Sequence, residues 1–72
     1  MSPRRPNARR YPVHVEGWPE GQTKDLMVDI NNGLQAGALV DIWSERRQAW
    51  ICCRVLPTAG YAYIITVQIK RS

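Results

Sequence analysis

Apolar and polar residues alternate through most of the chain after residue 12, which is the pattern of β-strands with one buried face. Segments rich in Gly, Pro and Asn separate the alternating stretches, and these residues favour turns. The pattern predicts five strands, over residues 13–16, 24–30, 38–44, 49–56 and 61–69. Short strands with almost no helix predict an all-β fold, either a small five-stranded antiparallel barrel or a strongly bent sheet.

Residues 23–36 allow a second interpretation, because Leu26, Ile30 and Leu34 also recur at the spacing of one helix face. The β-branched residues in this stretch favour a strand over a helix. The sequence Asn-Asn-Gly at 31–33 is a strong turn signal, since Asn and Gly tolerate positive φ angles. We therefore predict a strand that ends at this turn, with the helix as the alternative.

The turn between the third and fourth strands predicts which side chains share a face, if Arg46 and Arg47 form its centre. One face is then small and aliphatic, and it is the predicted interior: Ala38, Val40, Ile42, Ile51, Cys53, Val55, Ala62 and Ile64. Closing the next hairpin over 57–60 places Arg54 opposite Tyr63. The other face carries aromatic and charged residues: Trp43, Trp50, Tyr61, Tyr63, Asp41 and Arg54. A face this apolar must be covered by the N-terminal half, by another copy of the chain or by a ligand.

The net charge of +4 belongs entirely to the first ten residues, which contain Arg4, Arg5, Arg9 and Arg10 and no acidic residue. The remaining 62 residues carry six basic and six acidic side chains. Prolines at positions 3, 6 and 12 interrupt regular structure in the basic stretch. We predict a disordered basic arm over 1–12 and a single small domain over 13–72. Such an arm suits a phosphate backbone or an acidic protein surface.

Membrane and secretory signals are not expected in this chain. It has no apolar run of the roughly 20 residues that span a bilayer, and no apolar segment follows the N-terminal arginines. Cys52 and Cys53 are adjacent, so in a strand they point to opposite faces and do not readily form a disulfide. These features predict a cytoplasmic protein.

Catalytic and metal-binding patterns are also not expected. His14 is the single histidine and lacks the convergent partners that a zinc site requires. Asp25, Asp29 and Asp41 occupy scattered positions, so the sequence gives no reason to pair them, and solvated charges are expected. No phosphate-binding loop or Ser-His-Asp signature is present. We therefore predict a protein without enzyme activity, metal or cofactor.

Four features follow one another closely in the second half of the chain. They are a run of alternating residues over 37–43, a short polar turn, a second run over 49–55 and a Gly-Tyr pair at 60–61. In this pattern the segment 37–67 resembles Tudor- and KOW-like small β-barrels. The resemblance implies binding of nucleic acids or of peptides and partner proteins, and rarely catalysis. The arginine arm and the loop around Trp18 depart from the usual pattern of these barrels.

Aromatic and basic side chains cluster on the predicted outer face, where rings can stack on bases and arginines can pair with phosphates. The main hypothesis is a non-enzymatic nucleic-acid-binding module that uses the arm and this face: Arg4, Arg5, Arg9, Arg10, Trp43, Arg46, Arg47, Trp50, Arg54 and Tyr63. The alternative is a small regulatory or inhibitory protein that binds a larger protein complex, since Trp, Tyr and Arg also dominate protein interfaces. Trp43 and Trp50 could instead be core residues under the Trp18 loop.

Overall fold

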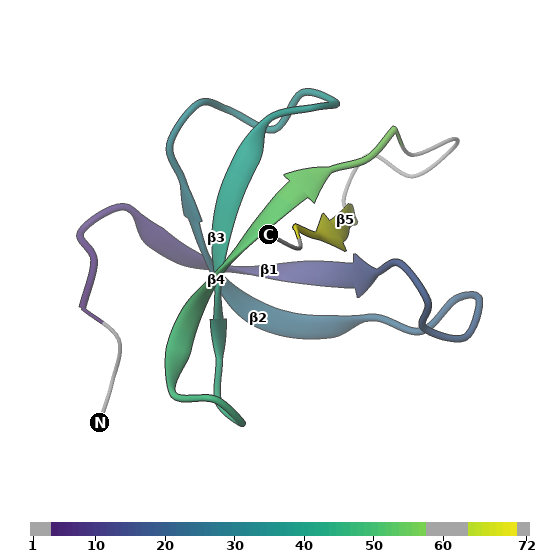
Figure 1. Ribbon diagram of the computed structural model, residues 1–72, viewed down its shortest axis with the longest axis horizontal. Helices are drawn as coiled ribbons and strands as arrows, with labels where there is room; N and C mark the ends of the chain where they lie inside the picture. The colour runs from purple at the N-terminus through teal and green to yellow at the C-terminus, as the bar shows by residue number, and fades with distance from the viewer. Residues whose placement is uncertain (1–3, 58–63, 71–72) are drawn as a thin grey trace.

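The computed structural model describes residues 4–57 and 64–70. Its strands form a closed barrel in chain order (Figure 1): β1 (Ala8–Val15), β2 (Lys24–Ile30), β3 (Leu39–Ser44), β4 (Ala49–Val55) and β5 (Ile65–Ile69). The prediction of a small five-stranded all-β fold is confirmed. No helix occurs in the described ranges, and β2 occupies the segment for which a helix was the alternative. The turn signal that follows β2 is confirmed by Gly33, whose φ is 88°.

The barrel closes through one parallel strand pair. Each strand is antiparallel to the next along the chain, whereas β1 and β5 run parallel, with Val13 opposite Ile65 and Val15 opposite Val67. An up-and-down order of an odd number of strands brings the first and last strands together in the same direction. The fold is therefore a mixed barrel, where the sequence predicted a purely antiparallel one.

Strand β1 begins at Ala8, whereas the sequence predicted a strand that starts at residue 13. The prediction is wrong for residues 8–12, which pair with β2 from Ala8 opposite Asp29 to Pro12 opposite Asp25. The β5 partner is in register only with Val13 and the two residues after it. Pro12 thus has a strand neighbour on one side only within the described ranges, and an edge position tolerates a residue without an N–H donor.

The interior consists mostly of small β-branched side chains, which suit a barrel of this width. The buried set is Val13, Val15, Val28, Ala38, Val40, Ile42, Cys53, Val55, Ile65 and Val67. The partly buried residues that pack against it are Tyr11, Trp18, Leu26, Ile30 and Ile51. The aliphatic face predicted for β3 and β4 is therefore the interior, with Ile51 at its margin.

The two C-terminal strand pairings differ in how well the sequence predicted them. The β3–β4 register is confirmed, with Trp43 opposite Trp50. The β4–β5 register is wrong, because Arg54 lies opposite Gln68 and Val55 lies opposite Val67. The observed pairing of β4 with β5 is displaced from the predicted pairing by an odd number of residues. The face of β5 that was predicted to point outward therefore points into the barrel. Tyr63, the predicted partner of Arg54, is outside the described residues, as are Tyr61 and Ala62.

Candidate ligand-binding surface

Strand register places two rows of side chains on the outer surface of β1 to β4. The first row is Ala8, Asp29, Asp41 and Cys52. The second row, which we call the aromatic row, is Arg10, Met27, Trp43 and Trp50. Both rows face outward because the residues that alternate with them, including Val28, Val40 and Ile42, are buried inside the barrel.

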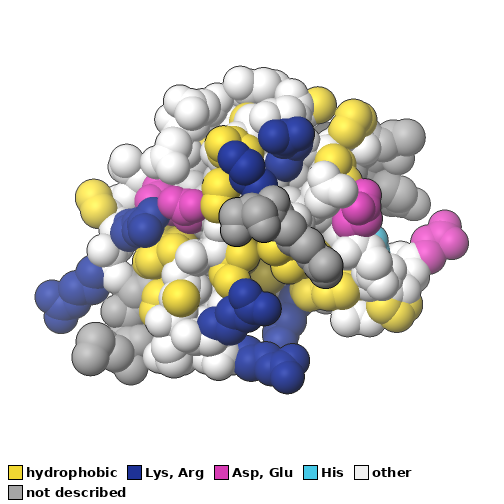
Figure 2. Space-filling view, in the orientation of Figure 1, with side chains coloured by type: hydrophobic (Ala, Val, Ile, Leu, Met, Phe, Trp, Pro, Cys, Tyr) yellow, Lys and Arg dark blue, Asp and Glu magenta, His cyan; other side chains and the backbone are white. Residues whose placement is uncertain are grey.

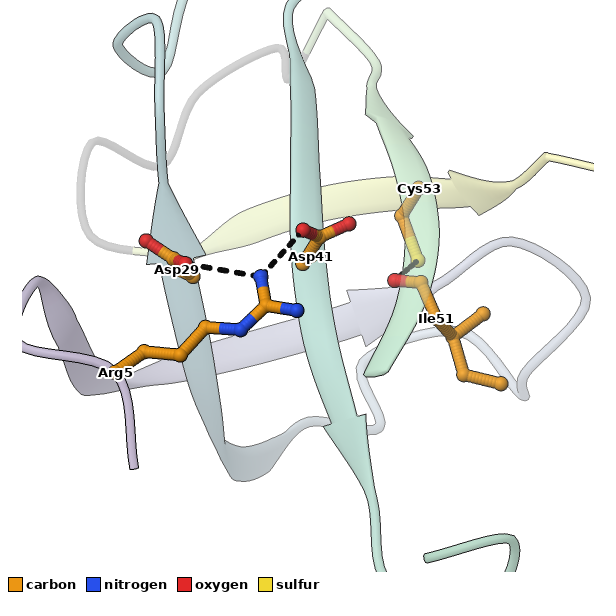
Figure 3. Close-up of polar contacts among 5 residues, drawn as sticks. All are labelled: Arg5, Asp29, Asp41, Ile51 and Cys53. Atoms are coloured by element: carbon orange, nitrogen blue, oxygen red, sulfur yellow. Dashed lines mark hydrogen bonds and ion pairs between the residues drawn. The ribbon is translucent and has the colours of Figure 1, made fainter. Parts of the chain in front are cut away.

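The first row contains an ion-pair cluster that the sequence did not predict. Asp29 lies opposite Asp41 in the β2–β3 pair. Arg5 donates from Nη1 to Oδ2 of Asp29 at 3.1 Å and to Oδ2 of Asp41 at 2.7 Å. Figure 3 shows the Arg5 side chain extending across β2 to lie between these carboxylates. The bonds to Asp41 and then to Asp29 raise the pKa of the Arg5 guanidinium above its ordinary value. The expectation of separate, solvated aspartates is therefore wrong for this pair.

The same guanidinium also lies over one member of the aromatic row, Trp50. Its Cζ atom lies 4.4 Å from the centroid of the Trp50 ring, a cation–π geometry. Trp43 and Trp50 meet edge to face, with ring centroids 5.6 Å apart and an interplanar angle of 64°. Trp50 is partly covered by the segment that precedes β1, whereas Trp18 packs against the interior cluster and against His14. Both outer tryptophans are half-buried, which is intermediate between a core and a free surface position.

A hollow of about 610 Å³ adjoins the aromatic row at the end of the barrel near the β3–β4 turn. We call it the aromatic–basic hollow. Its charged lining residues are Arg10, Lys24, Arg46, Arg47, Asp25 and Glu45. Four basic and two acidic side chains give this site a net charge of +2, of which Arg10 supplies one charge from the basic N-terminal segment. The aromatic rings in its lining belong to Trp18 and Trp43, and apolar side chains such as Ile42 and Ile51 also line it.

Local hydrogen bonds fix the turn that carries Arg46 and Arg47. Ser44 lies opposite Ala49, so residues 45–48 make the connection. The Arg47 backbone N–H donates to Oγ of Ser44 at 3.2 Å, and the Gln48 side-chain amide donates to the Glu45 carbonyl at 2.7 Å. Gln48 has a φ of 52°, which closes the turn in the left-handed region. Both arginines are exposed at the rim of the hollow.

The remaining predicted residues are not all brought to this site. Arg54 lines a second hollow of about 570 Å³, together with Glu16, Gln68, Ile69 and Lys70. Arg4 and Arg9 are exposed. Figure 2 shows Lys and Arg side chains spread around exposed hydrophobic surface on one face of the molecule, without a single block of positive charge.

The sequence did not indicate that Lys24 and Met27 line the aromatic–basic hollow. It also did not indicate that Asp29 and Asp41 lie together and share one ion-pair partner. Alternation did place Met27 and Asp29 on one face of β2. Their neighbours across the sheet depend on the β2–β3 register, which the intervening residues 31–38 do not determine in the way that a tight turn does. No local pattern indicates that Arg5 reaches this pair.

Chemistry beyond ion pairs and stacking is sparse in the part of the chain that the structure describes. It has no group of three or more His, Cys, Asp or Glu side chains arranged to hold a metal ion. His14 places Nδ1 2.6 Å from the carbonyl oxygen of Gln22. Cys52 and Cys53 are free, and burial raises the pKa of the Cys53 thiol to about 11.

None of the described segments is a helix long and apolar enough to cross a membrane.

Comparison with known proteins gives no match to this chain among family models, curated proteins or solved structures. The geometry of the barrel surface is therefore the basis for assigning a function to this chain. Its two distinctive features are the aromatic–basic hollow and the adjoining ion-pair cluster around Arg5.

Proposed function

We propose that this protein is a non-enzymatic module that binds single-stranded nucleic acid at the aromatic–basic hollow. One observation supports the proposal: two tryptophans and four basic residues line the same hollow. The basic residues are Arg10, Lys24, Arg46 and Arg47. Single-strand binders combine a positively charged groove that follows the backbone with aromatic side chains on which bases stack. Arginine forks pair with phosphate oxygens, so the rim would hold the backbone while the rings meet the bases.

A single strand fits this surface better than a duplex, because unpaired bases expose the flat faces that stack on aromatic rings. Trp43 adds a second feature that favours a ligand. Its Nε1 is buried and has no hydrogen-bond partner among the described residues. A buried donor without a partner in a native protein calls for an explanation, such as a functional role or a bound water or ion. A ligand oxygen that reached Nε1 would satisfy this donor.

We also propose that the barrel is of the Tudor- or KOW-like kind. The closed five-stranded barrel and the confirmed β3–β4 hairpin support this assignment at the level of architecture. Barrels of this kind bind nucleic acids or peptides, which agrees with a binding function. A shared architecture does not by itself select the ligand, so the assignment to nucleic acid depends on the hollow and its charges.

The proposal is tested by fluorescence anisotropy with labelled oligo-U and oligo-dT of about 12 nucleotides, within the usual site size of small binding folds, and with a duplex of the same length. The Arg46→Glu/Arg47→Glu variant reverses two charges at the hollow. The Arg54→Glu/Lys70→Glu variant is the matched control, since it reverses two charges at the second hollow. We expect single strands to bind more tightly than the duplex, and only the first variant to lose affinity, by about tenfold or more. Equal losses in both variants, or no saturable binding, would contradict the proposal.

A second candidate function is that of a small regulatory protein that binds a larger protein complex. The observation that favours it is the contact of Arg5, Trp50 and Trp43, because Arg and Trp are enriched at energetically important interface positions. A pull-down from lysate with and without nuclease separates the two functions. Partners that are retained after nuclease treatment support this candidate, whereas partners that nuclease releases support nucleic-acid binding.

A further inference from the structure

Two carboxylates and an indole ring form a receptor for one guanidinium on the outer face of the barrel. Asp29 and Asp41 supply the carboxylates and Trp50 supplies the ring; we call these three residues the arginine cradle. Figure 3 shows that the cation between the carboxylates comes from Arg5, which lies before the first strand. The cradle is thus built by the barrel, whereas its occupant comes from outside it.

The cradle requires a cation. Like charges directly opposite each other in a sheet repel. The Asp29 side chain exposes only 9% of its surface and the Asp41 side chain 25%, so water solvates neither carboxylate fully. The indole ring adds a preference for a flat, weakly hydrated cation, which is the chemistry of arginine and not of lysine. The same negative charge makes the cradle unsuitable for phosphate.

Arg5 occupies the cradle incompletely. Its side chain keeps 36% of its surface exposed, and both ion pairs use the single nitrogen Nη1. No hydrogen bond within the described part of the chain uses Nη2 or Nε of Arg5. The residue sits before a turn in which the Ala8 N–H donates to the Arg5 carbonyl at 3.0 Å, so its approach direction is fixed by its own backbone. An arginine that arrived on another backbone could place two nitrogens on the two carboxylates.

We propose that the arginine cradle is a binding site for an arginine side chain presented by another polypeptide, and that Arg5 is its tethered competitor. The partner presents an exposed arginine in an extended segment without a neighbouring acidic residue, because the cradle itself is acidic. This site is separate from the proposed nucleic-acid surface, since the aromatic–basic hollow carries the opposite charge and does not include Asp29 or Asp41.

Competition from Arg5 gives the proposal a measurable signature. A short tether holds a competing group at an effective concentration in the millimolar range. The observed affinity for a free arginine peptide equals the affinity of the open cradle multiplied by the fraction of time that Arg5 leaves the cradle open. Removing the Arg5 side chain should therefore strengthen binding of the peptide, by about tenfold if Arg5 fills the cradle about nine-tenths of the time.

The test uses the full chain and a capped peptide with the sequence of residues 3–7, Pro-Arg-Arg-Pro-Asn. A matched peptide carries lysine in place of both arginines. Binding is followed by the NMR shift of the Trp50 indole N–H in the wild type, in Arg5→Ala and in Arg5→Lys, which keeps a cation near the carboxylates if Arg5→Ala fails to fold.

We expect Arg5→Ala to bind the arginine peptide about tenfold more tightly than the wild type does, with a smaller gain for Arg5→Lys. The lysine peptide should bind several-fold more weakly, and adding Asp41→Asn to either variant should remove the preference for arginine. A folded Arg5→Ala or Arg5→Lys chain that binds neither peptide at millimolar concentration would overturn the proposal. Equal affinity for the two peptides, or binding that Asp41→Asn leaves unchanged, would overturn it as well.

Discussion

Asp29 and Asp41 lie directly opposite each other on β2 and β3, with the Arg5 guanidinium between their carboxylates. The sheet register forces these like charges together, and a residue outside the barrel offsets part of their negative charge. The same Arg5 side chain also lies over the Trp50 ring. The basic segment that appeared free in the sequence is therefore attached to the fold in two ways: residues 8–12 pair with β2, and the Arg5 side chain reaches the barrel from outside the strand. Arg4 and Arg9 stay exposed.

Replacing Arg5 should destabilise the barrel. In Arg5→Ala the buried Asp29 carboxylate faces Asp41 without a cation, so we expect a lower melting temperature in a circular dichroism scan. Arg4→Ala is the matched control, because it removes an equal charge from an exposed neighbour. Adding Asp41→Asn to Arg5→Ala should recover part of the loss. Identical melting of Arg5→Ala and Arg4→Ala would show that the cluster does not stabilise the fold.

The adjacent cysteines should differ in how well they tolerate serine. Cys53 is 2% exposed and lies inside the barrel, whereas Cys52 is half-buried on the outer face. Cys53→Ser buries a hydroxyl among apolar neighbours and should lower the free energy of unfolding by about 1–3 kcal/mol. Cys52→Ser should cost less than about 1 kcal/mol. Urea unfolding of the two variants measures the difference, and equal losses would be inconsistent with the interior position of Cys53.

The Cys53 thiol should make stability fall in alkaline solution. Burial, with smaller effects of Cys52 and Asp41, raises its pKa from the ordinary 9.0 to about 11. The folded state holds the thiol proton more tightly than the unfolded state does. The resulting stability is fully present below pH 9 and is lost as pH rises toward about 11.

Cys53→Ala lacks this titration and serves as the reference. The free-energy gap between the wild type and Cys53→Ala should shrink by about 2 kcal/mol over this pH range, which follows from the size of the pKa shift. Urea unfolding at several pH values measures the gap. A gap that stays constant with pH would mean that the thiol has an ordinary pKa in the folded protein.

Sequence patterns predicted the parts of this fold that short turns determine. Alternation identified the interior face of β3 and β4, and the polar residues 45–48 fixed how the two strands pair. The β4–β5 register was missed because residues 56–64 separate these strands, and a long connection does not set register. Val67 must also meet Val15 of β1, a constraint from barrel closure that no local pattern contains.

The candidate site was predictable only where its residues lie on one hairpin. Trp43, Arg46, Arg47 and Trp50 all come from β3, β4 and their turn, and their proximity follows from one register. The contributions of Arg10, Lys24 and Met27 depend on pairings between strands that are distant in sequence. The contact of Arg5 with Trp50 depends on the whole sheet being assembled.

Salt dependence should separate the arginines that meet phosphate from the one that is paired within the chain. For single strands each phosphate contact contributes about 0.7 to the slope of log affinity against log salt. Arg10→Ala/Arg46→Ala/Arg47→Ala should therefore flatten the slope by about 2, since all three side chains line the hollow. Arg5→Ala should leave the slope unchanged, because Asp29 and Asp41 already neutralise Arg5. An equal change in both variants would assign Arg5 to the phosphate surface.

The most direct test of the proposed nucleic-acid surface is an NMR titration of the isotope-labelled protein with an unlabelled single-stranded oligonucleotide. We predict that the largest shift changes occur around the aromatic–basic hollow, at Arg10, Met27, Trp43 and Arg46, including the Trp43 indole N–H. Arg54, Gln68 and Lys70 at the second hollow should change little. Shifts that centre on the second hollow, or an unchanged spectrum at saturating oligonucleotide, would contradict the account.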